Sequence, residues 1–181
     1  LCVNKSTAAR NINYLEEKGY VISGKTNVGE FGLDLAGEYS YYAPAEKEIK
    51  GAAAEAVAKG EVKAALAVDV NGSARRAAAI SGQVNLKPTY GTVSRYGIIA
   101  CACSGEQIGV TAANAEDAKE ILSVIAGHDS KDGTSLPAEK YEYSTSEDVS
   151  AMKIAVAKEL YDAASDDVKA KIDAYAESLK K

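Results

Sequence analysis

The chain has 181 residues, 26% of them charged, and a formal net charge of −5 at pH 7. This length suits one domain with a substantial hydrophobic core, so a single domain over residues 1–181 is expected. The acidic balance and the lack of a basic block argue against a protein that binds nucleic acid on its own. No apolar run reaches the roughly 20 residues of a membrane span and no signal peptide is visible, which predicts a cytoplasmic protein.

The first part of the chain alternates helical and extended patterns. A helix capped by Ser6 or Thr7 and ending before Gly19 leads into a short predicted strand over residues 20–23. The Ala- and Glu-rich segment over residues 52–58 predicts a second helix, with Gly60 as its stop. A buried-strand pattern over residues 62–70 then leads into a turn.

The remainder continues this alternation. Residues 96–103 predict an apolar strand, residues 108–110 a short extended piece, and residues 115–126 a helix capped by Asn114. A surface connection over residues 129–148, a strand over residues 152–157 and a final helix capped by Ser165 follow. The predicted inward positions of the two helices are Ala118, Ile121, Leu122 and Ile125, and then Val168, Ile172, Tyr175 and Leu179. This order predicts an α/β layered fold, with a mixed, mostly parallel sheet flanked by helices.

Cysteine and histidine usage favours no metal site. Cys2, Cys101 and Cys103 are an odd number, and the C-x-C spacing suits same-side strand positions better than a zinc site. His128 is the only histidine, and a capping or turn role is more common for such a residue than metal ligation. We therefore expect reduced thiols, no metal and no cofactor.

The turn Asn71-Gly72-Ser73 is the position most informative about chemistry. A serine that follows a strand end and a glycine can present its hydroxyl beside successive backbone N–H groups, as nucleophile sites do. Serines after Gly-containing turns are also common in ordinary loops. On these residues alone both interpretations stay open.

Longer motifs around this turn resemble a known family. The segment NLKPTYGTVSRYG, residues 85–97, resembles the GLKPTYGRVSRYG segment of the amidase signature family. GKTNVGEF, SYYAP, EQIG, VIAGHD and MKIAVAKE resemble further family segments and stand in family order. The similarity is to the branch formed by the glutamine-hydrolysing A subunits of glutamyl-tRNA(Gln) amidotransferases, and it covers nearly the whole chain.

This resemblance implies a partial amidase signature fold and a Ser–cisSer–Lys catalytic triad. Position by position, it places the nucleophile at Ser73 and a following arginine at Arg75. The oxyanion-hole segment would be Val70, Asn71 and Gly72. Ile49 occupies the position of the bridging serine, and the family's lysine has no match in this sequence.

Two functions follow from these observations. The resemblance implies glutamine hydrolysis that feeds ammonia to Glu-tRNA(Gln), with B and C subunits as partners. Loss of a general base costs about 10²–10⁴ in rate, so this chain alone is expected to be catalytically impaired. The alternative is a degenerate, noncatalytic α/β domain that acts as a binding or interaction module.

Three structural expectations follow from the same motifs. Ser73 should lie at a strand-to-turn edge with an accessible hydroxyl. Residues 24–31 should pack beside the helix over residues 52–58 and the segment 85–97. The pocket mouth should be lined by Ile49, Asn71 and the charged side chains of residues 46–50.

Overall fold

The computed structural model describes residues 9–36, 38–41, 51–138, 150 and 152–180. The chain divides into two compact units, Leu1–Glu142 and Tyr143–Lys181. The single domain expected over residues 1–181 stays a prediction. Among the described residues, no helix has both the length and the apolar content needed to cross a bilayer.

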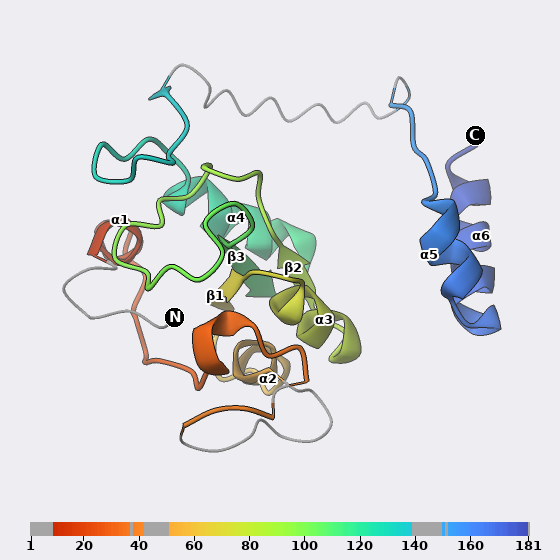
Figure 1. Cartoon of the computed structure of the whole chain (residues 1–181), viewed down its shortest axis with the longest axis horizontal. Helices are drawn as coiled ribbons and strands as arrows, with labels where there is room; N and C mark the ends of the chain where they lie inside the picture. The colour runs from red at the N-terminus through yellow and green to blue at the C-terminus, as the bar shows by residue number, and fades with distance from the viewer. Residues whose placement is uncertain (1–8, 37, 42–50, 139–149, 151, 181) are drawn as a thin grey trace. The chain divides into compact units, whose positions relative to one another are not determined.

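A three-stranded sheet lies at the centre of the first unit (Figure 1). Its strands are β1 (Ala64–Asp69), β2 (Val84–Leu86) and β3 (Gln107–Ala112), in the order β1-β3-β2. β3 pairs antiparallel with both neighbours, with Val68 opposite Ile108 and Leu86 opposite Val110. The predicted mostly parallel sheet is not confirmed. β1 and β2 run in the same direction, but β3 lies between them and runs the opposite way.

Helices flank this sheet, as the α/β prediction requires. The helices of the first unit are α1 (Ala9–Glu17), the short 3₁₀ helix η1 (Glu30–Gly32), α2 (Ala52–Ala58), α3 (Ser73–Ile80) and α4 (Ala115–Ile125). α2 and α3 contact each other and the sheet, whereas α1 packs on α4, which contacts all three strands. All six residues of β3 are buried, so both faces of the central strand are covered.

The helix predictions succeed where a local signal sets the boundary. The Asn114 side chain accepts a hydrogen bond from Asp117 N at 2.8 Å, which confirms the cap of α4. The inward face of α4 is confirmed by its buried residues Ala118, Ile121 and Ile125. α2 ends as expected, with Gly60 at a φ of +70°. The proposed α1 caps, Ser6 and Thr7, lie outside the described residues.

Three predicted strands are wrong: residues 20–23, 96–103 and 152–157 form no strand. In the second of these segments, the backbone N–H groups of Cys101 and Ala102 donate to the Glu106 carboxylate, at 2.9 and 3.2 Å. These amides are therefore not available to a neighbouring strand. Cys101 and Cys103 are both exposed and free, and they do not occupy the strand positions predicted for them.

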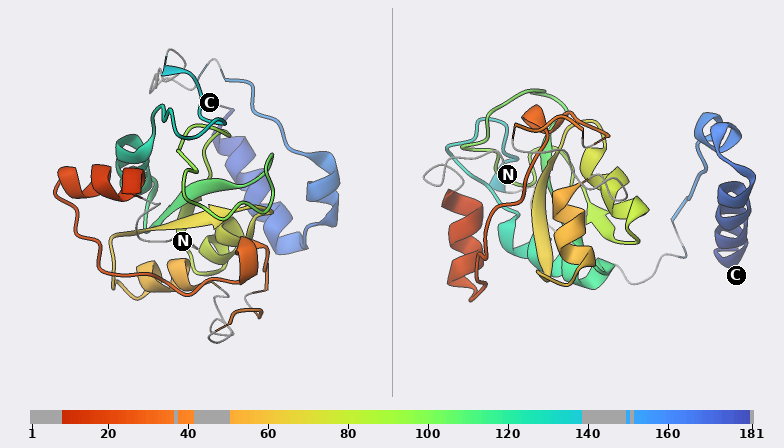
Figure 2. Two further views of the ribbon diagram at one scale, coloured as in Figure 1. Left: turned by 60° about the vertical axis from the view of Figure 1, so that its left-hand side comes forward. Right: turned by 90° about the horizontal axis from the view of Figure 1, so that it is seen from below.

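The described residues of the second unit form the helices α5 (Lys158–Ala163) and α6 (Asp166–Ser178), visible at the C-terminal end of the chain in Figure 2. α6 begins directly after Ser165 as predicted, although the Ser165 side chain makes no capping hydrogen bond. Within the second unit by itself, α6 does not bury the predicted stripe, since Val168 is 42% and Tyr175 67% exposed. Two short helices do not supply enough surface to cover such a stripe.

Candidate functional site

Ser73 is the first residue of α3 and follows β1 across a three-residue turn. Gly72 closes the turn at a φ of +107°, a conformation that a glycine adopts without strain. The half-buried Ser73 hydroxyl donates a hydrogen bond to the Gly32 carbonyl oxygen at 3.1 Å. Ser73 therefore lies at the predicted end of the strand and turn, and it also begins a helix. The sequence analysis does not predict this eight-residue helix, because the motif it uses ends at the serine.

A buried carboxylate holds this turn. Asp69 ends β1 with no solvent exposure, and its two oxygens accept Gly72 N at 2.9 Å and Arg75 N at 3.3 Å. Asp69 thus binds backbone N–H groups at the start of α3, where an anion is favoured. Of the three oxyanion-hole positions taken from the family, Gly72 already donates its N–H within the protein.

Two cations neutralise Asp69. Arg75 donates to it through Nε at 3.0 Å, and Lys87 donates through Nζ at 3.2 Å. Burial alone raises the pKa of Asp69, but the hydrogen bonds from Arg75 and Lys87 outweigh it and hold the pKa below its usual range. The hydrogen bond to Asp69 also raises the pKa of Arg75. Arg75 is therefore a structural partner of Asp69 in this arrangement.

The start of α3 also anchors the loop that carries η1. Three side chains donate to three carbonyl oxygens of that loop: Ser73 Oγ to Gly32, Asn71 Nδ2 to Leu33 at 3.1 Å, and Arg76 Nη1 to Leu35 at 2.9 Å. These hydrogen bonds join residues about 40 positions apart in the sequence, so no local sequence pattern predicts them.

A cavity of about 460 Å³ lies beside Ser73. Its wall comes from residues 26–32, the start of α2, β1, and the first turn of α3. Residues 26–31 and the start of α2 line the same cavity, so the segment predicted to pack beside α2 shares a cavity wall with this helix. Segment 85–97 does not contribute to this wall.

The predicted pocket mouth has a different composition. Asn71 is exposed and does not line the cavity, because its amide is directed to Leu33. Ile49 and the charged residues 46–50 lie outside the described residues. Among the described lining residues, the ionisable side chains are Glu30 and Asp34, and neither lysine nor histidine is present.

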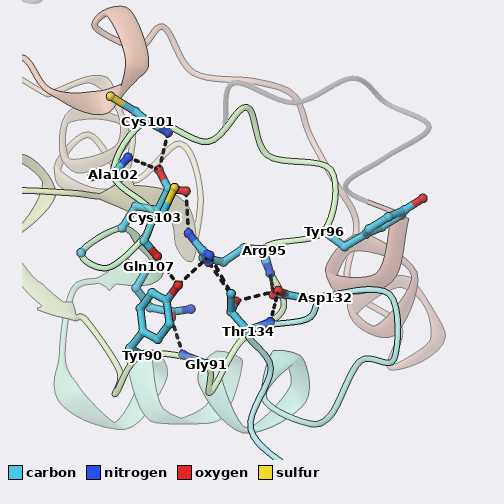
Figure 3. A network of polar contacts seen from close by, with 12 residues as sticks. Tyr90, Gly91, Arg95, Tyr96, Cys101, Ala102, Cys103, Gln107, Asp132 and Thr134 are labelled. Atoms are coloured by element: carbon cyan, nitrogen blue, oxygen red, sulfur yellow. Dashed lines mark hydrogen bonds and ion pairs between the residues drawn. The ribbon is translucent and has the colours of Figure 1, made fainter.

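The motif over residues 85–97 serves a second buried network (Figure 3). Glu106, 1% exposed, accepts Arg95 Nη1 at 2.6 Å. Arg95 also donates to Tyr90 Oη at 2.7 Å and to Thr134 Oγ1 at 3.1 Å, and its backbone N–H donates to Asp132. Burial raises the pKa of Asp132, but hydrogen bonds from Thr134 and the Arg95 N–H hold it below its usual range. This motif therefore joins residues 90–106 to residues 132–134.

His128 and the thiols do not belong to either network. His128 Nδ1 lies 2.9 Å from the Leu136 carbonyl oxygen, which agrees with the turn role expected of it. Within the described part of the chain, His, Cys, Asp and Glu side chains form no group of three or more suited to a metal ion.

Comparison with known proteins places these features in context. A family model described as Amidase matches residues 3–181. The glutamyl-tRNA(Gln) amidotransferase A subunit of Methanosarcina acetivorans is 43% identical over 163 residues, which are 84% of this chain and 34% of that protein. The corresponding A subunit of Halobacterium salinarum is 44% identical over 168 residues, 86% of this chain and 40% of that protein. The chain thus spans well under half the length of these relatives.

Solved structures agree with the sequence similarity. The A subunit of the Thermotoga maritima glutamyl-tRNA(Gln) amidotransferase superposes with a TM-score of 0.66 at 36% identity, covering 70% of this chain and 30% of that one. The peptide amidase of Stenotrophomonas maltophilia gives a TM-score of 0.61 at 28% identity, covering 71% of this chain and 30% of that one.

Proposed function

Because the chain belongs to the amidase family, we propose that it shares the lineage of the glutamine-hydrolysing A subunits and that its Ser73 is not activated for amide hydrolysis. The chain would retain the scaffold of the nucleophile turn and act as a noncatalytic binding module. By the same relationship, its partners would be B and C subunits of an amidotransferase.

The direction of the Ser73 hydrogen bond carries this proposal. A serine becomes a nucleophile when a nearby base accepts its proton, and here the proton is directed to the Gly32 carbonyl oxygen. A backbone carbonyl is far too weak a base to remove that proton. The described wall of the cavity offers no lysine or histidine, and Ile49 stands where the family has its bridging serine.

The nearby lysine does not replace the missing base. Lys87 Nζ donates to Asp69, to the Val70 carbonyl oxygen at 3.2 Å and to the Gly105 carbonyl oxygen at 2.8 Å. An ammonium group that donates to a carboxylate and two carbonyls has no lone pair with which to accept a proton. Lys87 thus stabilises the turn through its hydrogen bonds to Asp69 and Val70, and it is not a proton acceptor for Ser73.

Ammonia release from glutamine tests the proposal directly. The 181-residue chain and its Ser73→Ala variant should release ammonia at the same background rate, alone or with B and C subunits. Turnover by the unsubstituted chain that the Ser73→Ala substitution abolishes would show that Ser73 is activated after all. Circular dichroism of both proteins controls for folding.

A further inference from the structure

The loop over residues 101–105 carries two thiols that the proposed function does not use. Cys101 and Cys103 are both free and exposed, and a single residue, Ala102, separates them. A small oxidant in solution can therefore reach either sulfur. Figure 3 shows both side chains beside the network of Arg95, with the Cys101 thiol directed away from Cys103.

The backbone that joins the two cysteines is fixed by hydrogen bonds. The Cys101 and Ala102 N–H groups donate to Glu106 Oε2 at 2.9 and 3.2 Å. The Ala102 carbonyl oxygen accepts Glu106 N at 3.0 Å, and the Cys103 carbonyl oxygen accepts the Tyr90 hydroxyl. Glu106 thus holds the conformation of the chain between the two thiols.

A disulfide between residues two positions apart requires a specific bend of the chain. In extended backbone such residues lie about 6.6 Å apart, whereas the Cβ atoms of a disulfide lie about 3.5–4.5 Å apart. The Ala102 backbone would have to close this gap, and it is the backbone that Glu106 holds. Disulfide formation and the hydrogen bonds of Glu106 therefore compete for the conformation of one loop.

We propose that Cys101 and Cys103 are a dithiol modification site, which a low-molecular-weight disulfide oxidises to an intrachain disulfide. Closure of this disulfide weakens the hydrogen bonds from the Cys101 and Ala102 amides to Glu106. The C-x-C spacing favours the intrachain bond, because the second thiol is held near the first at a high effective concentration. The site does not involve Ser73 and is independent of the proposed function.

The reaction consists of two thiol–disulfide exchanges with glutathione disulfide as the oxidant. The thiolate of one cysteine attacks a sulfur of glutathione disulfide, which forms a mixed disulfide on the protein and releases one glutathione thiolate. The thiolate of the other cysteine then attacks the protein sulfur of the mixed disulfide and releases the second glutathione. The protein loses two electrons and two protons, and one glutathione disulfide becomes two glutathione molecules.

Mass spectrometry in glutathione redox buffers tests the site. A Cys2→Ser background leaves Cys101 and Cys103 as the only thiols of the chain. This two-thiol chain should lose the mass of two hydrogens, with the disulfide mapped to residues 101–103 and reversed by excess glutathione. The matched controls Cys101→Ser and Cys103→Ser should instead gain one glutathione. No oxidation, stable glutathione adducts or disulfide-linked dimers of the two-thiol chain would overturn the proposal.

Amide hydrogen exchange measured by NMR tests the coupling to Glu106. Oxidation should accelerate exchange of the Cys101 and Ala102 amides about tenfold or more, because their hydrogen bonds to a charged group are weakened. The Gly72 amide, which donates to the Asp69 carboxylate, is the internal control and should keep its rate. Unchanged exchange at Cys101 and Ala102 in the oxidised chain would overturn the coupling.

A substitution tests the same coupling in the opposite direction. Glu106→Gln weakens the acceptor of the two amides, so by reciprocity it should shift the dithiol–disulfide equilibrium toward the disulfide about threefold or more. Asp69→Asn changes a buried carboxylate outside this loop and should leave the equilibrium unchanged. Circular dichroism controls for folding of both variants. An equal shift in both, or no shift in a folded Glu106→Gln chain, would overturn the role given to Glu106.

Discussion

Two parts of the first unit hold a buried carboxylate against an arginine, and they differ in what the arrangement encloses. Asp69 binds Arg75, whose side chain is 50% exposed, beneath a turn that borders a cavity. Glu106 binds Arg95, whose side chain is 10% exposed, inside a network that joins three chain segments. The first region resembles a catalytic site and the second a structural one, yet the same chemical pair fixes the backbone in both.

This comparison gives a structural role to the family motifs around Ser73 that does not depend on catalysis. An ionised carboxylate that accepts several backbone N–H groups stabilises the fold whether or not chemistry follows. Asp69 does this for Gly72 and Arg75, and Glu106 does it for Cys101 and Ala102. The presence of Asp69 and Glu106 therefore indicates a stable backbone, and it does not by itself indicate that Ser73 is a nucleophile.

The largest expected effect comes from breaking the more buried pair. Arg95→Met would leave the Glu106 carboxylate without its cation and remove the donors to Tyr90 and Thr134. Loss of one partner of a buried ion pair costs about 3–5 kcal/mol. Urea denaturation should show a loss of this size, with the exposed Lys119→Met as control. A loss no larger than the control's would show that this network does not stabilise the unit.

Asp69→Asn should cost less, about 2 kcal/mol, because Arg75 is half exposed to solvent and Lys87 keeps its hydrogen bonds to the Val70 and Gly105 carbonyl oxygens. The same denaturation experiment measures it. A larger loss of stability than that of Arg95→Met would show that the Asp69 ion pairs stabilise the first unit more than the Glu106 pair does.

The pH dependence sharpens this contrast. The pKa of Asp69 is held below its usual range in the folded state, so the unfolded state takes up the proton first as the pH falls. Its contribution to stability is complete above the unfolded-state pKa of about 3.9 and declines as the pH falls through the lower folded-state value. Asp69→Asn should reduce the acid-induced loss of stability below about pH 4. Identical acid denaturation profiles would contradict this assignment.

The sequence predicts the elements better than their arrangement. α4 could be placed because Asn114 and the spacing of Ala118, Ile121 and Ile125 are local signals. The position of β3 between β1 and β2 depends on long-range pairing, and so do the bonds from α3 to residues 32–35. Ser73 and its turn could be found from their motif. The hydrogen bond from the Ser73 hydroxyl to the Gly32 carbonyl oxygen could not be found from the motif, since the two residues stand 41 positions apart.

The smallest expected effects compare one serine from each region. Ser94 is 1% exposed, donates to the Asp129 carboxylate at 2.5 Å and accepts Tyr96 N at 3.1 Å. Ser73 is half-buried and donates to one neutral carbonyl. Hydrogen bonds to charged groups contribute about 1.5–3 kcal/mol and neutral ones about 0.5–1.5 kcal/mol, so Ser94→Ala should destabilise the unit more than Ser73→Ala. Paired urea denaturation of the two variants measures the difference. If Ser73→Ala were the more costly, the hydrogen bond to Gly32 would be a main anchor of the η1 loop, and the turn would owe its geometry to that contact as much as to Asp69.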